Sequence, residues 1–355
     1  MNGLARMWTV ASLELRQRVR GAAWYVLLGV FVLLVLVVTV FTTIATRNTD
    51  APGAVLYSLI VYFVLLLGTL VTPALSGNAI NGDRENGTLA TTQVTLVTTP
   101  QLVIGKFLAA WITALGFLAA ALPFLLFALV LGGASADTAF VSILVLAAEL
   151  GVVAAVGVGV SGLIRRPLFS VVTTYLVVAL LSIGSLIAFG LGGMVAQREV
   201  TVSYEIIDWE ASGDEIDPDT GMPVDPVCET VVSSYSVPRF DSVWWTLAAN
   251  PYVLLADAAP THFDRHGNPD DLFGTLKLGV RQAQLPPDVD SGWSECDQAY
   301  PVDDQPTPRE VIDSTVPSWA VGLGIHAALG LGLLAGAISR TRAPARRLAA
   351  GSRIA

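Results

Sequence analysis

The chain has 355 residues, of which 53% are hydrophobic and 14% are charged, whereas about 25% of residues are charged in an ordinary soluble domain. This composition excludes an ordinary soluble globular protein. The formal net charge of −9 also argues against nucleic acid as a partner.

Residues 1–21 are predicted to form a cytoplasmic helix at the membrane interface. Drawn at about 100° per residue, this segment has one apolar stripe, with arginines on its other sides. The stripe comprises Leu4, Trp8, Ala11, Leu15 and Val19. Such an amphipathic helix is suited to lie in the plane of the interface; the alternative is a solvated basic tail.

Six apolar blocks predict six transmembrane helices, because each has about the length of a helix that crosses a bilayer. The blocks cover residues 22–45, 54–77, 107–131, 140–164, 168–196 and 318–339. The first block is longer than the apolar region of a secretory signal peptide, so we expect it to stay as an anchor. The expected fold class is an all-α polytopic membrane protein, with spans one to five in residues 22–196.

The short loops indicate the orientation of the chain. Thirteen Lys and Arg side chains flank the spans on the side that holds both termini, whereas the opposite short loops, 46–53 and 132–139, hold only Arg47. Loops rich in Lys and Arg stay in the cytoplasm. We therefore expect a multi-pass protein of the cell membrane, with both termini and the basic tail 340–355 in the cytoplasm.

The loop between spans two and three is predicted to form a second amphipathic helix, over residues 83–99. Threonines gather on one arc of this helix and apolar side chains on the other. Asp83 and Glu85 lie near its N-terminus, where the helix dipole favours negative charge. Gly87 permits close backbone approach, and Pro100 ends the helix.

The same loop carries a family resemblance. The run Asp83-Arg84-Glu85-Asn86-Gly87-Thr88-Leu89, followed by Thr99-Pro100 and Gly105-Lys106, resembles the signature of type-2 permease subunits of ATP-binding-cassette (ABC) transporters. Glu14-Leu15-Arg16 before the first span, Asn250-Pro251 before the last span and the six-span layout are similar to that family as well.

This resemblance implies that residues 83–99 are a coupling helix, which docks onto a separate cassette ATPase subunit. It also implies a second permease copy, or a homologous permease, beside this chain in the lipid bilayer. The docking residues that it implies are Asp83, Arg84, Glu85, Gly87, Thr88 and Leu89.

The chain is not expected to hydrolyse ATP itself. A phosphate-binding loop needs Gly-x-x-x-x-Gly-Lys-Ser/Thr, but Pro100 stands at the first glycine position before Gly105-Lys106, and Phe107 follows the lysine. ATP and Mg²⁺ are therefore assigned to the partner ATPase, and no cofactor to this chain. The spans offer one Glu and one His, so no catalytic residue is assigned either.

Four further residues are candidates for functional sites. Glu149 lies near the middle of span four, where a carboxylate is costly and usually faces protein or water. We hypothesise that it lines a transport path; the alternative is a protonated Glu149 bonded to a neighbouring helix. His326 in span six is expected to pack or to form a hydrogen bond. His262 and His266 are not assigned a metal, because the Gly267-Asn268-Pro269 that follows favours a turn.

Residues 197–317 are predicted to form an acidic extracellular insertion, with 23 acidic and 6 basic side chains and a charge of −17. Alternation within 199–243 predicts two strands around the turn-rich residues 214–226. The apolar segment 242–259 is expected to lie as a helix on the outer membrane surface, or else in the core of the insertion. Pro and Asp dominate 261–317, which predicts irregular structure. The insertion is thus expected to be mixed α/β or irregular.

Both cysteines of the chain, Cys228 and Cys296, lie in this insertion. In an oxidising compartment a disulfide between them would close a loop of about 68 residues and stabilise the insertion by a few kcal/mol. The alternative is two separate thiols, because the sequence does not fix the distance between their Cα atoms.

Together these features predict the permease subunit of an ATP-driven exporter, with no substrate assigned. The alternative is a receptor or scaffold in the membrane, whose acidic external segment binds a partner. Co-purification of an ATPase would distinguish the two functions.

Overall fold

The computed structural model describes residues 3–48, 51–87, 97–213, 215–218, 221–287, 294–295 and 306–341. This part of the chain is mostly helical and holds one two-stranded sheet. Six of its helical segments are long and apolar enough to cross a membrane. The prediction of six candidate membrane spans is therefore confirmed for the described residues.

The candidate spans begin and end within a few residues of the predicted blocks, except that the second ends later, at Glu85, and the third begins earlier, at Thr99. They are α2 (Ala22–Thr46), α3 (Pro52–Ser76) continued by α4 (Asn81–Glu85), α6 (Thr99–Val130), α7 (Ala136–Leu163), α8 (Pro167–Ala179) continued by a π-helical turn η1 (Leu180–Gly184) and α9 (Ser185–Val195), and α14 (Ser318–Thr341). The other elements are α1 (Gly3–Arg20), β1 (Gln197–Ile207), β2 (Cys228–Pro238), the 3-10 turn η2 (Phe240–Ser242), α10 (Trp245–Ala248), α11 (Pro251–Ala258), α12 (Leu272–Gln282) and α13 (Pro308–Ser314).

The chain divides into two compact units, which we call the helical unit and the ribbon unit. The helical unit comprises Met1–Leu186, Leu247–Lys277 and Pro317–Ala355, and the ribbon unit comprises Ile187–Thr246 and Leu278–Val316. This division differs from the expected insertion 197–317, since Leu247–Lys277 belongs to the helical unit.

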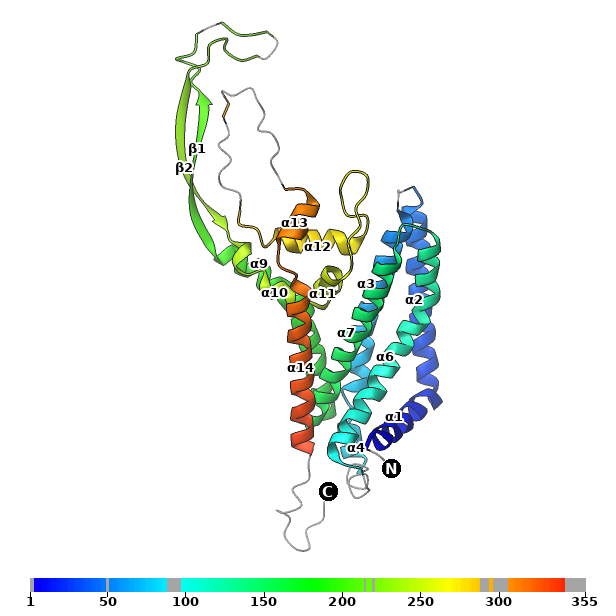
Figure 1. The fold of residues 1–355 in the computed structure, drawn as a ribbon. Helices are drawn as coiled ribbons and strands as arrows, with labels where there is room; N and C mark the ends of the chain where they lie inside the picture. The colour runs from blue at the N-terminus through cyan, green and yellow to red at the C-terminus, as the bar shows by residue number, and fades with distance from the viewer. Residues whose placement is uncertain are drawn as a thin grey trace. The chain divides into compact units, whose positions relative to one another are not determined.

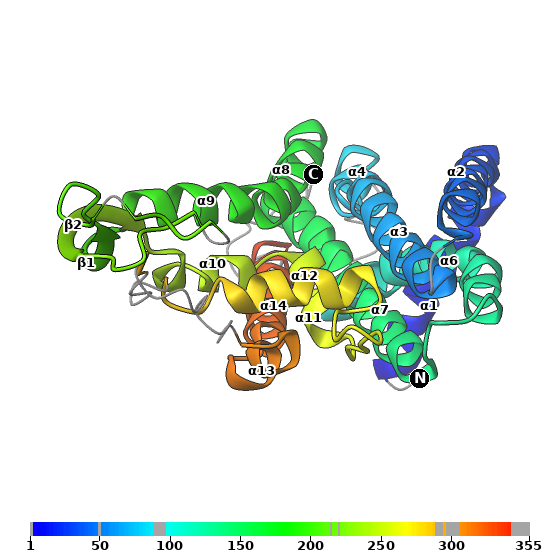
Figure 2. The ribbon, with the colours of Figure 1, turned by 90° about the horizontal axis from the view of Figure 1, so that it is seen from above.

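The core of the helical unit lies where α3, α6 and α7 pack together (Figure 1). Figure 2, seen from above, shows α3 beside α6 and α7. α14 packs along α7, where a Cβ on Gly159 or Gly162 would collide with Leu333 or Ala337. Small residues at these two positions therefore let the two helices approach closely.

α1 confirms that the N-terminal segment is a helix, but its apolar side chains divide between two environments. Val10 and Ala11 are buried, and α1 packs against α6. Leu4, Trp8 and Val19 are exposed. The exposed part of the predicted stripe is therefore free to contact a membrane interface.

Residues 242–259 do not form a single surface helix, so that prediction is wrong. α10 and α11 are two short helices, and the break between them lies at Asn250. The Asn250 side-chain oxygen accepts hydrogen bonds from the backbone N–H groups of Tyr252 and Val253, at 2.9 and 3.4 Å. An Asn cap followed by Pro251 starts a new helix, because proline fits the first turn. α11 is buried against α7 and α14 within the helical unit.

The predicted strand pair is confirmed in the ribbon unit. β1 and β2 pair antiparallel over all eleven positions, from Gln197 opposite Pro238 to Ile207 opposite Cys228. Figure 1 shows the two strands side by side as a long curved ribbon. Across the ribbon, the Thr201 and Ser234 hydroxyls form a hydrogen bond of 3.0 Å.

The expectation of irregular structure over 261–317 is wrong in part, because α12 and α13 form there. Phe273 and Val280 of α12 are buried, and their spacing of seven residues puts both on one helix face. α13 begins with a capping box, in which Thr307 and Glu310 satisfy each other's backbone N–H groups. The many Pro and Asp residues of 261–317 favoured turns in the sequence-based prediction, so neither helix was expected.

Candidate functional site

Three charged side chains, distant in sequence, meet in the helical unit: Glu14 of α1, Asp83 of α4 and Lys106 of α6. Lys106 is only 2% exposed and forms salt bridges with both carboxylates. Its Nζ lies 2.8 Å from Asp83 Oδ2 and also donates to Glu14 Oε1. Burial of an ammonium group is costly unless the group is paired. The two carboxylates therefore stabilise the charged side chain of Lys106 in its buried position. We call the three residues the Lys106 cluster.

Close packing of α1 on α6 brings Glu14 within reach of Lys106. Gly105 faces Val10 and the backbone carbonyl of Met7, and a Cβ on Gly105 would lie 2.7 Å from Val10 Cβ. That separation is too short for two carbon atoms, so the approach requires glycine. The Gly105-Lys106 pair thus combines a helix contact with an ionic contact.

Arg18 provides a second link between α1 and the spans. Its Nη2 donates to the backbone carbonyl of Leu75 at 3.0 Å, and its Nη1 donates to Thr113 Oγ1 at 3.4 Å. Burial lowers the pKa of the Arg18 guanidinium, and Glu14 opposes this shift. Arginine still stays protonated at physiological pH, so Arg18 places a positive charge between α3 and α6.

α4 places the predicted docking residues in two environments. Asp83 is held in the Lys106 cluster, and Arg84 Nη1 donates to Asn81 Oδ1 at 3.0 Å. Glu85 and Gly87 are exposed, and Gly87 has a φ of +68°. That left-handed backbone favours glycine, because other residues are strained there.

Much of the predicted coupling helix lies outside the described residues. Thr88 and Leu89 belong to the segment 88–96, which the structure does not describe, and α6 begins at Thr99. A single helix over the whole of 83–99 is wrong, because α4 ends at Glu85, the left-handed backbone of Gly87 ends the helical path, and Thr98 is extended. A helix within 88–96 stays a prediction. The described start of the loop is anchored, because the backbone N–H groups of Ile80 and Asn81 donate to Ser161 Oγ of α7 at 3.0 and 3.1 Å.

Glu149 and His326 form a buried pair between α7 and α14, and each is 1% exposed. His326 Nδ1 lies 2.8 and 3.0 Å from the two carboxylate oxygens of Glu149, and Nε2 lies 2.9 Å from the backbone carbonyl of Ala249. A carbonyl can only accept, so Nε2 carries a proton. A second proton must lie between Nδ1 and Glu149. The pair is therefore neutral as a whole, whichever residue holds that proton.

Glu149 therefore bonds to a neighbouring helix, with His326 as its partner; that Glu149 is the protonated member of the pair stays a prediction. A cavity of about 10 Å³ adjoins the pair and is lined by Thr69, Val153 and Pro251, among others. A cavity needs at least about 10 to 15 Å³ to hold one water molecule. The described space is too small for a transported molecule, and the role of Glu149 in a path stays a hypothesis.

The turn between α10 and α11 joins this pair to the fifth span. Ala249 accepts from His326, while Asn250 Nδ2 donates to the backbone carbonyl of Ser182 at 2.6 Å and to Ser185 Oγ at 2.9 Å. Ser182 lies in the π-helical turn η1. Such turns free backbone groups from the regular helix pattern and are frequent at functional sites. Neither the turn nor these contacts can be expected from the sequence.

His262 and His266, the two histidines considered as metal ligands, contact different partners. His262 Nε2 lies 2.8 Å from Ser135 Oγ and 3.3 Å from Asp137 Oδ1, and the backbone N–H of His266 donates to Asp264 Oδ1. In the part of the chain that the structure describes, no three His, Cys, Asp or Glu side chains gather as metal ligands would.

Asp271 is the buried carboxylate at the start of α12. Its Oδ1 accepts a hydrogen bond of 2.7 Å from the backbone N–H of Gly274. Burial raises the pKa of Asp271 to about 6, with a smaller contribution from Asp270, whereas Lys277 opposes the rise. The folded chain therefore binds this proton more tightly than the unfolded chain does.

Stability is expected to fall as pH rises from about 4 to about 6, by roughly 2 to 3 kcal/mol from Asp271 alone. Asp271→Asn keeps a hydrogen-bond acceptor and should remove this part of the pH dependence of thermal unfolding. Asp264→Asn is the matched control, because hydrogen bonds lower the pKa of exposed Asp264, which gives the opposite slope. An unchanged slope in Asp271→Asn would contradict the assignment.

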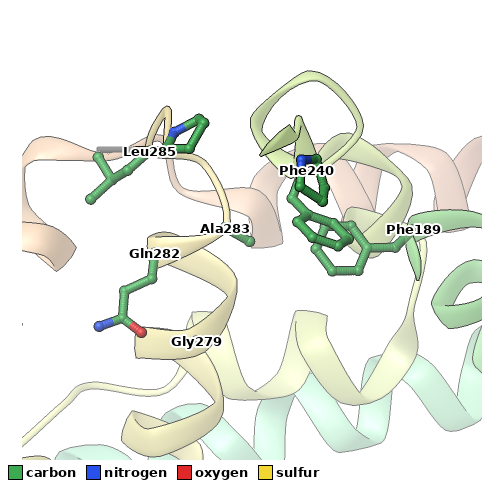
Figure 3. Close-up of a pocket in the computed structure, with 8 residues that line it drawn as sticks. Phe189, Phe240, Gly279, Gln282, Ala283 and Leu285 are labelled. Atoms are coloured by element: carbon green, nitrogen blue, oxygen red, sulfur yellow. The ribbon is translucent and has the colours of Figure 1, made fainter. Parts of the chain in front are cut away.

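The ribbon unit contains an open hollow of about 270 Å³ (Figure 3). Phe189 and Phe240 form one side, with ring centroids 5.1 Å apart, and Gly279 and Ala283 face them across the gap. Gln282 is the one polar side chain among the described residues that line the hollow. The described lining is therefore suited to apolar groups, and none of these described residues is an acid or a base.

Cys228 is disulfide-bonded. The other cysteine of the chain, Cys296, lies outside the described residues. The pairing of the two therefore stays a prediction.

Comparison with known proteins names no relative. No family model matches the chain, and no curated protein matches its sequence.

Proposed function

We propose that the chain is the membrane-spanning permease subunit of an ABC exporter. A separate cassette ATPase would hydrolyse ATP beneath the membrane, and a second permease, identical or homologous, would complete the transport route. The resemblance of Asp83–Leu89 to the family signature is the first support for this proposal. The charge distribution supports a cytoplasmic position for that loop.

The observation that carries the proposal is the way the loop is anchored. Its exposed tip at Glu85 is available to a partner, whereas Asp83, two residues earlier, is held by Lys106 of α6. The same cluster includes Glu14 of α1, and Ser161 of α7 holds the start of α4. A force applied at Glu85 would therefore reach α6 and α7 directly and α1 through Lys106, as coupling to a moving ATPase requires.

Coupling also requires that the ATPase contacts the tip differently in its ATP-bound and ATP-free states, since only differential binding shifts a conformational equilibrium. The proposed order is nucleotide binding, movement of the docked loop, and movement of α1, α6 and α7 with it. The substrate is left unassigned.

Glu85→Lys is expected to abolish transport and the stimulation of the partner's ATP hydrolysis, while membrane insertion stays intact. The side chain is exposed, so reversal of its charge should disturb docking rather than folding. The measurement is ATP hydrolysis and transport in vesicles that contain the purified complex. Glu210→Lys, at an exposed position beyond β1, is the matched control and should leave both readouts unchanged. Undiminished transport in Glu85→Lys would refute the docking assignment.

A receptor or scaffold is the second candidate, and the compact ribbon unit favours it. Such a protein would bind its partner through the ribbon unit and would need no ATPase. Purification of the full chain from its own membranes distinguishes the two candidates. An ATPase in equal amount supports the permease, and its absence supports the scaffold.

A further inference from the structure

β2 is a nearly uncharged strand within a strongly acidic segment of the chain. Of its eleven residues only Glu229 is charged, so the run Thr230–Val237 has no charged side chain. β1 carries Arg198, Glu199 and Glu205. The uncharged run lies within a segment whose net charge is −17. Charges and prolines are the usual protection of an open edge against pairing, and this run has neither.

The outer edge of β2 is open in the described part of the chain. β1 pairs along one side of β2, and on its own outer side β1 is approached by Ser294, which bridges to Glu205. No described backbone group outside β1 forms a hydrogen bond with residues 228–238. Most side chains of β2 are exposed as well. A two-stranded ribbon by itself is marginally stable in water, so a further strand at this edge would stabilise it.

We propose that β2 pairs antiparallel with β2 of a second copy of this chain, forming a four-stranded sheet across a two-fold axis. An uncharged strand edge can meet its own copy without like-charge repulsion, whereas the charged side chains of a strand such as β1 would oppose such a contact. A two-fold contact brings the same patch of both copies together. When the axis is normal to the sheet, it makes the two strands antiparallel.

Geometry and charge together fix the register. A two-fold axis normal to the sheet keeps each side chain on the same face of the sheet in both copies. Directly opposed residues share a face, so the axis must pass beside one residue, which then lies opposite the same residue of the other copy. With Ser234 at the axis, Val231 lies opposite Val237 on the apolar face. The same register places Glu229 opposite Arg239 of the other copy, one residue beyond β2, where the guanidinium also forms a salt bridge with Asp241 of its own chain. Opposite charges then face each other at both ends of the contact. A register centred on Ser233 would instead leave Glu229 opposite Val237.

The test is oxidative crosslinking of the full chain in its membrane, with single cysteines introduced on either strand. Ser234→Cys is expected to shift most of the chain to the mass of a covalent dimer, because directly opposed Cβ atoms lie about 4.5 to 5.5 Å apart. Thr201→Cys is the matched control, since Thr201 pairs with Ser234 across the ribbon and is also exposed. Thr201 lies one strand further from the axis, so the Thr201→Cys chain should stay monomeric.

The register has its own test in mixed dimers of tagged chains. Val232→Cys and Ser236→Cys should crosslink weakly alone and strongly when the two variants are co-expressed, because these residues lie opposite each other. Crosslinking at Thr201 equal to that at Ser234 overturns the proposal. The proposal is also overturned if Ser234→Cys crosslinks to a different protein. It is overturned as well if Ser234→Cys neither crosslinks nor reacts with a maleimide, because this chain itself would then cover the edge of β2. These outcomes do not depend on an ATPase, so failure of the docking assignment would leave them unchanged.

Discussion

Replacing His326 with leucine is expected to destabilise the helical unit by about 4 kcal/mol, because breaking a buried pair leaves an uncompensated charge or polar group. Glu149 would then lose its partner at a site that is 1% exposed, and Ala249 would lose a donor. The measurement is thermal unfolding of the full chain in detergent, with the yield of folded protein as a second readout.

The double variant Glu149→Leu/His326→Leu is the control for this result. Well-packed hydrophobic residues often replace a buried ion pair with little loss of stability, so the double variant should be more stable than His326→Leu alone. Equal destabilisation in both variants would mean that lost packing, rather than the unpaired carboxylate, causes the effect.

Glu149→Gln separates stability from transport. The amide of the new side chain can still donate to His326 Nδ1, so the link between α7 and α14 should persist with a loss of about 1 kcal/mol. If transport is unchanged while assembly is normal, the hypothesis that Glu149 lines a path is dismissed. If transport is lost in a normally assembled protein, the carboxylate itself is needed.

Replacing Lys106 with methionine is expected to lower stability by about 2 kcal/mol and to uncouple ATP hydrolysis from transport. Methionine keeps most of the volume, but Glu14 and Asp83 would face each other without a cation. The expected loss is smaller than for His326→Leu, because these carboxylates are 20% and 28% exposed. Thermal unfolding and stimulation of the partner ATPase are the two measurements.

Two variants control for this interpretation. Arg16→Met removes an exposed positive charge from the same helix as Glu14 and should change neither readout. The triple variant Glu14→Gln/Asp83→Asn/Lys106→Met removes all three charges and should be more stable than Lys106→Met. If the triple variant regains stability but not coupling, the ionic link itself transmits the motion. If ATP hydrolysis stays coupled to transport in Lys106→Met, the Lys106 cluster has only a structural role.

The local prediction failures have specific causes. The apolar run 242–259 has the composition of one helix, but Asn250 caps a new helix and Pro251 accepts the first-turn position. The sequence does not reveal α12, because the turn-forming residues around it outnumber its apolar ones. In both segments tertiary contacts select a structure that composition alone does not favour.

The candidate site is predictable in its parts but not in its assembly. Asp83, Glu149 and the Gly105-Lys106 pair each stand out in the sequence, and the lone lysine at the start of an apolar block is the available signal for a buried ion pair. The partners Glu14 and His326 lie 92 and 177 residues away in sequence. No local pattern encodes such a distance.

The sequence by itself determined the six candidate spans and the strand pair, because hydrophobic length and alternation act over roughly ten to thirty neighbouring residues. Only the tertiary structure decided which charges meet. A buried Lys106 or Glu149 is tolerated because helices that are remote in sequence bring a partner to 2.8 Å, and that pairing depends on how α1, α4, α6, α7 and α14 pack rather than on any single segment.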